Sequence, residues 1–192
     1  MPRVSAQYRD ARRAHILAAA RRCFVRDGFH QTSMQDLVRE AGMSSGAVYR
    51  YFASKDEMIV AIAEENLDQI VAIVRESVAG GADLGEALAA ALEFASKRHA
   101  EDGFAAIALV VWSEALRNPV LAARLRDSFD AAGQELAETA RASSNGVKLA
   151  PDVLATTLLC VLPGYLLQAA IRGPDAVAPI PDGVRALFPS GR

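Results

Sequence analysis

The sequence predicts an all-α protein in which a small N-terminal domain of three helices precedes a larger helical part. Three observations lead to this prediction. Alternating strand patterns are almost absent, while apolar residues recur at helical spacing along nearly all of the 192 residues. Glycine, proline and capping residues divide that pattern into segments of helical length. Apolar residues make up 52% of the chain and charged residues 23%, a balance typical of a folded globular protein.

The first three helices are separated by glycines. The first is expected over 6–27, where its apolar face ends before a glycine. The second begins after Ser33, a residue type that caps helix N-termini, and its apolar series ends at Gly42. The third is expected over 44–52 or 45–52. Two short helices joined by a tight glycine turn form the arrangement of a helix-turn-helix.

Capping pairs and breakers delimit five further helices. Ser54 and Glu57 form the S-x-x-E capping box that begins the fourth helix, and the glycine pair at 80–81 is the expected joint between domains. A loop is expected at 143–146. The later helices are expected over approximately 54–79, 83–99, 103–117, 119–142 and 151–171. The predicted divisions are a first domain 1–53, a linking helix 54–80 and a second domain 81–192.

The segment 153–171 contains no charged residue, and two interpretations fit it. Its length suits a membrane span, but Thr156, Pro163 and Gln168 lie within it and no other segment matches it. We therefore favour a buried or subunit-interface helix over a membrane helix. On this interpretation, glutamate at Leu158 or at an equivalent apolar position should prevent dimerisation.

The chain end predicts no long final helix. The last twenty residues hold four of the eight prolines, which interrupt helices. A second interface helix is therefore either very short, around 184–188, or replaced by the helix over 119–142. Leu162 is the other position at which we expect glutamate to give monomers.

Charge is distributed unevenly along the chain. The first 55 residues carry ten Lys and Arg against four Asp and Glu, a net charge of +6. The remaining residues carry 11 against 19, a net charge of −8. A basic N-terminal segment is typical of a module that binds a polyanion.

The cysteines and the N-terminal apolar run bear on the compartment. Cys23 and Cys160 show no pairing pattern, and the apolar run 15–20 is too short for a signal peptide. A cytoplasmic protein is therefore expected.

The third helix has a surface that suits DNA recognition. Small residues at its start allow the backbone to approach base edges in the major groove. Tyr49 and Arg50 can reach phosphates on either side. A solvated helix face would normally carry Glu, Lys and Gln, so a merely structural three-helix core is the less favoured interpretation. The small residues are Ser44, Ser45, Gly46 and Ala47.

This stretch resembles the DNA-binding signature of tetracycline-repressor-like (TetR/AcrR) regulators. The resemblance covers about the first 60 residues, and its residues are Gly28-Phe29, Thr32-Ser33, Ala41-Gly42-Met43-Ser44, Gly46-Ala47-Val48-Tyr49, Tyr51-Phe52 and Ser54-Lys55-Asp56-Glu57. It implies a homodimer on a palindromic DNA operator, dimerised through 153–171 and released by a small apolar or amphipathic effector. It also implies that Gly46 and Ala47 lie against bases. The residues implied to hold phosphates are Thr32, Ser33, Tyr49, Arg50 and Lys55. Tyr51 stands where histidine is more usual.

The second part is expected to hold the effector. Family members bind ligands among helices of this region, and small-molecule sites combine aromatic walls with a few polar groups. Aromatic residues at helical spacing are also common in plain cores, so that alternative stays open. The candidate effector residues are Phe94, His99, Phe104, Trp112, Glu114 and Phe129.

Nothing in the sequence favours an enzyme. It has no phosphate-binding glycine loop, no nucleophile elbow and no His/Cys cluster with metal-ligand spacing, so no cofactor and no metal site are predicted. Two other interpretations remain: a transcriptional activator, and a DNA-binding protein without an effector. For a repressor, we expect an effector to shift the fourth helix and so change the separation of the two recognition helices.

Overall fold

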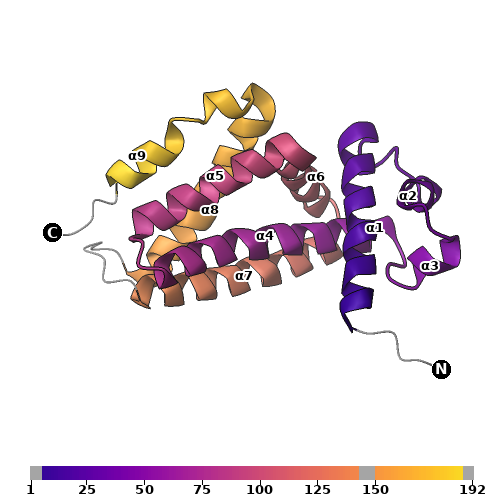
Figure 1. The fold of residues 1–192 in the computed structure, drawn as a ribbon, viewed down its shortest axis with the longest axis horizontal. Helices are drawn as coiled ribbons and strands as arrows, with labels where there is room; N and C mark the ends of the chain where they lie inside the picture. Colours follow the sequence, from indigo (N-terminus) through magenta and orange to yellow (C-terminus); the bar gives the residue numbers. More distant parts are fainter. Residues whose placement is uncertain (1–5, 143–149, 188–192) are drawn as a thin grey trace. The chain divides into compact units, whose positions relative to one another are not determined.

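The computed structural model describes residues 6–142 and 150–187, and these residues are helical with no strand (Figure 1). The all-α prediction is therefore confirmed for the described residues. The predicted loop at 143–146 and the end of the predicted helix around 184–188 lie outside them. The helices are α1 (Ala6–Asp27), α2 (Met34–Ala41), α3 (Ser45–Tyr49), α4 (Lys55–Ala79), α5 (Leu84–Asp102), α6 (Phe104–Ala115), α7 (Pro119–Ala142), α8 (Pro151–Arg172), the 3-10 helix η1 (Pro174–Ala176) and α9 (Ile180–Leu187).

The chain forms two units, Met1–Ala63 and Glu64–Arg192. The division lies inside α4, whereas the sequence placed the domain joint at Gly80-Gly81. These two glycines instead form the turn between α4 and α5 within the second unit, and Gly81 has a φ of 94° there. Helix α4 thus begins in one unit and ends in the other.

The first unit is a small helical core around α1. Helix α2 packs against α1, and Phe24, Leu37 and Val48 are each at most 1% exposed. Local signals set the helix ends. Ser33 caps α2, and Gly42 ends it in the left-handed conformation, with a φ of 60°. The start of α4 uses a variant of its capping box, because Ser54 accepts the N–H of Glu57 while the Glu57 carboxylate accepts the N–H of Ala53.

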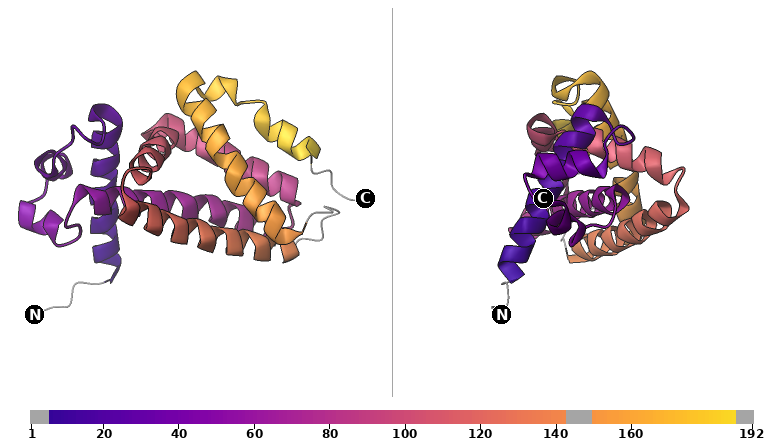
Figure 2. Two further views of the ribbon diagram at one scale, coloured as in Figure 1. Left: turned by 180° about the vertical axis from the view of Figure 1, so that it is seen from behind. Right: turned by 90° about the vertical axis from the view of Figure 1, so that its right-hand side faces the viewer.

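The second unit is built around one continuous apolar core. Helix α7 runs alongside α8, while α5 contacts α6, α8 and α9 (Figures 1 and 2). The predicted caps are present: Asp83 accepts the N–H of Glu86, and Asn118 accepts the N–H groups of Val120 and Leu121. The core contains apolar side chains of all these helices, among them Leu67, Val74, Leu88, Phe104, Leu136, Leu154, Tyr165 and Leu166.

Helix α8 is half covered by its own chain. One face, which includes Leu154 and Leu166, is buried in the core of the second unit. The opposite face leaves apolar side chains in solvent: Val153, Leu167 and Ile171 are 39–71% exposed. Among the described residues, α8 is the helix long and apolar enough to cross a membrane, and 28% of its apolar window is buried.

The orientation of α8 corrects one expectation. Leu158 and Leu162 are partly buried and line a cavity between helices of the second unit, so they do not form the outward face. Glutamate at these positions would therefore disturb the cavity. The outward face includes Cys160, which is exposed.

The last described segment is a short helix, in line with the expectation of no long final helix. Helix α9 has eight residues and follows η1. It packs against α5 and not along α8. The choice between a very short final helix and α7 as the second interface helix stays a prediction.

Candidate nucleic-acid interface and apolar cavity

The helix-turn-helix is formed by α2, the turn at Gly42 and α3. Ser44 caps α3 by accepting the N–H of Ala47 at 3.3 Å. Val48 is fully buried and anchors the helix from its inner side. The helix is shorter than predicted, because residues 50–51 form a turn and Phe52 enters the core.

The outer side of α3 carries small side chains and is mostly exposed to solvent. Ser44, Ser45 and Gly46 are exposed, Ala47 is half-buried, and Tyr49 is 48% exposed. A Cβ atom added at Gly46 would meet nothing within 4 Å. The fold therefore does not require glycine at position 46. Close approach of another molecule to the backbone at this position would require it.

A polar hollow lies beside this surface within the first unit. Its guanidinium groups come from Arg50 at the end of α3 and from Arg12 of α1, whose Nε donates to the Tyr8 hydroxyl oxygen at 3.0 Å. Among the described residues, neither arginine makes an ion pair. Tyr8 and Arg12 were not among the site residues predicted from the sequence; their i, i+4 spacing was the available signal. The full lining is Tyr8, Arg12, Gly42, Met43, Ser44, Ala47, Arg50 and Tyr51.

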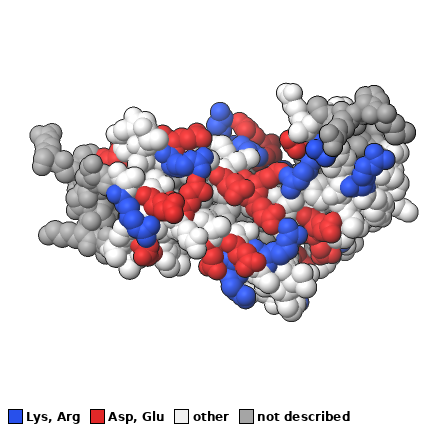
Figure 3. All heavy atoms as spheres, turned by 90° about the horizontal axis from the view of Figure 1, so that it is seen from below, with Lys and Arg blue, Asp and Glu red and all other residues white. Residues whose placement is uncertain are grey.

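Charge differs on the second unit. On the face shown in Figure 3, Asp and Glu side chains gather over α4 and α7. A shallow hollow there contains Glu64, Asp68 and Asp127 with one cation, Arg124, which pairs with Glu64 at 2.9 Å. Burial, together with the neighbouring carboxylates Glu135 and Glu65, raises the pKa of Asp68. This acidic face does not suit a polyanion.

Thr32 serves the fold. Its side chain is 1% exposed, and its hydroxyl donates to the carbonyl of Gly28 at 2.7 Å. In this conformation the hydroxyl therefore faces the core and is not free to hold a phosphate.

Lys55 also has an internal role. Its Nζ lies 2.8 Å from the carbonyl oxygen of Phe29, 3.0 Å from that of Thr32 and 3.4 Å from that of His30. It also lies 4.6 Å from the centre of the Phe29 ring. An ammonium has three N–H donors, and three carbonyls accept them here. Lys55 thus connects the start of α4 to the loop before α2, and its three N–H donors are used within the first unit.

Ser33 remains exposed but is engaged in a capping box. Its hydroxyl donates to Asp36 Oδ2 at 2.6 Å, and the Asp36 N–H donates to the Ser33 hydroxyl oxygen. Hydrogen bonds from the Ser33 hydroxyl and backbone lower the pKa of Asp36. On the same helix, hydrogen bonds from Arg22 and Arg26 lower the pKa of Glu40, which joins α2 to α1.

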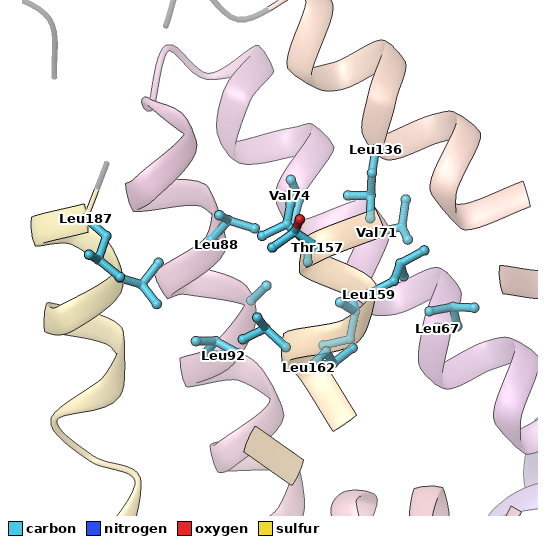
Figure 4. Close-up of a pocket in the computed structure, with 15 residues that line it drawn as sticks. Leu67, Val71, Val74, Leu88, Leu92, Leu136, Thr157, Leu159, Leu162 and Leu187 are labelled. Atoms are coloured by element: carbon cyan, nitrogen blue, oxygen red, sulfur yellow. The ribbon is translucent and has the colours of Figure 1, made fainter. Parts of the chain in front are cut away.

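The second unit contains an apolar cavity of about 200 Å³ (Figure 4). Side chains of α4, α5, α7, α8 and α9 surround it. Among the lining residues, Thr157 is the one whose side chain is not a pure hydrocarbon. The lining residues are Leu67, Ile70, Val71, Val74, Leu88, Ala91, Leu92, Leu136, Thr157, Leu158, Leu159, Val161, Leu162, Val184 and Leu187.

The predicted effector residues do not line this cavity. Phe104 is 1% exposed and packs edge-to-face against Phe94, with ring centres 6.3 Å apart. Trp112 packs against the same core, and the His99 carbonyl accepts the N–H of Gly103 at the end of α5. Phe129 lies in a separate groove between α7 and α8, and Glu114 is half-buried in the last turn of α6. The sequence signal for the cavity was the aliphatic spacing of α4 and α5, which a packed core shares.

Comparison with known proteins gives consistent results. The model of the family described as bacterial regulatory proteins, tetR family, matches residues 16–62. The HTH-type transcriptional repressor Rv1474c of Mycobacterium tuberculosis is 32% identical over 178 residues, 88% of each protein. YfiR of Bacillus subtilis, an uncharacterized HTH-type transcriptional regulator, is 47% identical over 68 residues, 35% of this chain and 33% of that protein. The structure of Salmonella enterica GusR superimposes with a TM-score of 0.72 at 25% identity, covering 97% of this chain and 99% of that one.

Proposed function

Since the chain belongs to the tetR family of bacterial regulatory proteins, and is thus a helix-turn-helix transcriptional regulator and not an enzyme, we propose that it is a homodimeric repressor of a palindromic operator. A small apolar effector releases it from DNA. The observation that carries the proposal is the exposed face of α3, where the small residues 44–47 are followed by exposed Tyr49 and Arg50. Such a protein acts where the DNA is, in the cytoplasm.

Recognition is assigned to the exposed side of α3. Gly46 and Ala47 face bases, because they let the backbone come close to the major groove. Ser44 and Ser45 border this contact, and Ser33 lies exposed at the start of α2 with its hydroxyl held by Asp36. Arg50 carries a guanidinium without an ion-pair partner among the described residues, so it is available to a phosphate. Thr32 and Lys55 support this surface from within and are not assigned to DNA.

The Tyr49 hydroxyl is assigned to a phosphate. Tyr49→Ala is expected to weaken binding to all DNA sequences by about 1–2 kcal/mol, because a hydrogen bond to a charged phosphate is lost. Tyr49→Phe should reproduce most of this loss, since it removes only the hydroxyl. Fluorescence anisotropy with operator and with unrelated duplex DNA measures both variants. A loss confined to one operator base would contradict the phosphate role.

Dimerisation is assigned to the outward face of α8 with α7 beside it. The exposed apolar stripe of α8 is too long for a surface left in water, and an isologous contact would cover it with the same stripe of a second copy. A groove between α7 and α8, lined by Phe129, Gly133, Leu159 and Cys160, continues this face. A bilayer is a poorer partner, because the other side of α8 is already packed in a protein core.

The effector site is assigned to the apolar cavity. Helix α4 contributes Leu67, Ile70, Val71 and Val74 to its wall, and the same helix begins at Lys55 in the DNA-binding unit. A ligand that binds better to one position of α4 would shift the population of dimers away from the operator spacing. The fixed half-site spacing of DNA makes affinity sensitive to a small displacement.

Binding-site selection from a random duplex library tests the proposal. The purified full-length protein should recover a palindrome, and sizing of the complex should give one or more dimers per site. Recovery of no consensus at low salt would contradict sequence-specific regulation. A consensus without twofold symmetry would contradict the homodimer arrangement while leaving DNA recognition intact.

A further inference from the structure

The cavity is lined almost entirely by aliphatic side chains. Its lining consists of Leu, Ile, Val and Ala side chains and one threonine. The hydroxyl of that residue, Thr157, donates to the carbonyl of Val153 at 2.8 Å, so its one hydrogen is already used. An apolar cavity of about 150 Å³ stays dry and binds small hydrocarbons. A cavity of about 200 Å³ with such walls therefore offers no free hydrogen-bond donor and almost no polar surface to a ligand or to water.

Helix α9 forms one side of this cavity. Val184 and Leu187 belong to its wall, and Figure 4 shows Leu187 across from Leu88 of α5. Leu187 is 77% exposed, which places it at the open side of the cavity. Helix α9 packs along α5, with Pro181 buried and Val184 partly buried against the core, while most of its other described residues are exposed.

A single arginine links α9 to α5. Arg185 Nε lies 2.9 Å from Glu86 Oε2, and its Nη2 lies 2.7 Å from Glu93 Oε1. Its remaining nitrogen, Nη1, pairs with Asp182 of α9 at 2.9 Å, which orients the guanidinium. Both glutamates are about half exposed, and exposed ion pairs of this kind each change an equilibrium by about fivefold or less. These ion pairs favour contact between α9 and α5, yet they are weak enough for α9 to separate from α5.

We propose that the cavity takes an effector whose buried part is a pure hydrocarbon, and that α9 closes over it, held to α5 by Arg185. This inference rests on the proposed effector role of the cavity. A polar group of the effector is expected at the open side beside α9, because the walls offer no free hydrogen-bond donor and almost no polar surface. The two carboxylates that hold Arg185 also make that side unfavourable for an anionic group.

The ligand class is tested on full-length protein with 1-aminoanthracene as a fluorescent probe. Competition with 1-octanol should be about tenfold or more stronger than with 1,8-octanediol, which must bury a second hydroxyl without a partner. Ala91→Leu, which adds volume at the wall, should weaken probe binding and so locate it. Equal competition by the diol would overturn the hydrocarbon assignment, and unchanged binding to the folded Ala91→Leu variant would overturn the location.

The closing role of α9 is tested by stopped-flow release of the same probe. Arg185→Gln should speed release about threefold to tenfold. Arg75→Gln is the matched control, because Arg75 also joins two helices, through Glu135 of α7, but lines no cavity. Equal release rates in wild type and Arg185→Gln would overturn the closing role. The effector role itself fails separately if the probe binds but no cavity ligand changes operator affinity.

Discussion

The substitution Cys160→Glu is expected to leave the protein monomeric. Cys160 is exposed near the middle of α8, on the face assigned to the second copy. In a twofold interface the same substitution occurs in both copies, so two carboxylates would enter one apolar contact without partners. Analytical ultracentrifugation should show a species near the monomer mass of 20.4 kDa. Operator affinity should fall about 100-fold or more, because two linked half-site contacts become independent.

Leu116→Glu is the control for this experiment. Leu116 is the most exposed large apolar residue of the described chain, at 89%, and it follows α6. Glutamate there changes the same charge without touching α8, so the dimer mass should persist. An unchanged dimer in Cys160→Glu would instead move the interface away from this face of α8. Helical circular dichroism of both variants separates loss of dimer from loss of fold.

The helix boundaries were predictable because their causes are local. Ser33, Asp83 and Asn118 each accept backbone N–H groups two or three residues ahead, and Gly42 ends α2 with its own conformation. These interactions depend only on neighbours in the sequence. The length of α3 was overestimated because Phe52 continues the apolar spacing but belongs to the core beyond the helix.

The candidate site was predicted only where the side chains point outward from a local element. The outward positions of Gly46, Ala47 and Tyr49 could be predicted from where α3 begins and from its inner residue, Val48. The inward roles of Thr32 and Lys55 depend on contacts that local patterns do not reveal: Lys55 reaches carbonyls 23 to 26 positions earlier in the chain.

The apolar cavity proposed as the effector site could not be predicted for a different reason. A cavity wall and a filled core share the same aliphatic spacing, so Val71 and Leu88 carry no signal that separates the two. Phe94 and Phe104 stood out in the sequence because aromatic side chains commonly line ligand sites. In the fold these two rings pack on each other instead. The docking of α9 on α5 likewise depends on tertiary contacts of Arg185 that no local pattern shows.

Lys55→Met is expected to lower the free energy of unfolding by about 2–4 kcal/mol. Methionine keeps an unbranched apolar side chain but removes the ammonium. Three carbonyls, of Phe29, His30 and Thr32, then lose a charged hydrogen-bond donor, and the cost falls mainly on the two partly buried carbonyls, those of Phe29 and Thr32. Urea unfolding followed by circular dichroism measures the change.

Salt dependence of DNA binding separates this internal role from a phosphate contact. Each phosphate contact contributes a slope of about 0.9 to the fall of log affinity with log salt. At a temperature where Lys55→Met is folded, its slope should therefore equal that of the wild type. Arg50→Met is the matched variant: its slope should fall by about 0.9, with stability within about 0.5 kcal/mol of wild type. A reduced slope in Lys55→Met with unchanged stability would show that Lys55 leaves its carbonyls to hold DNA.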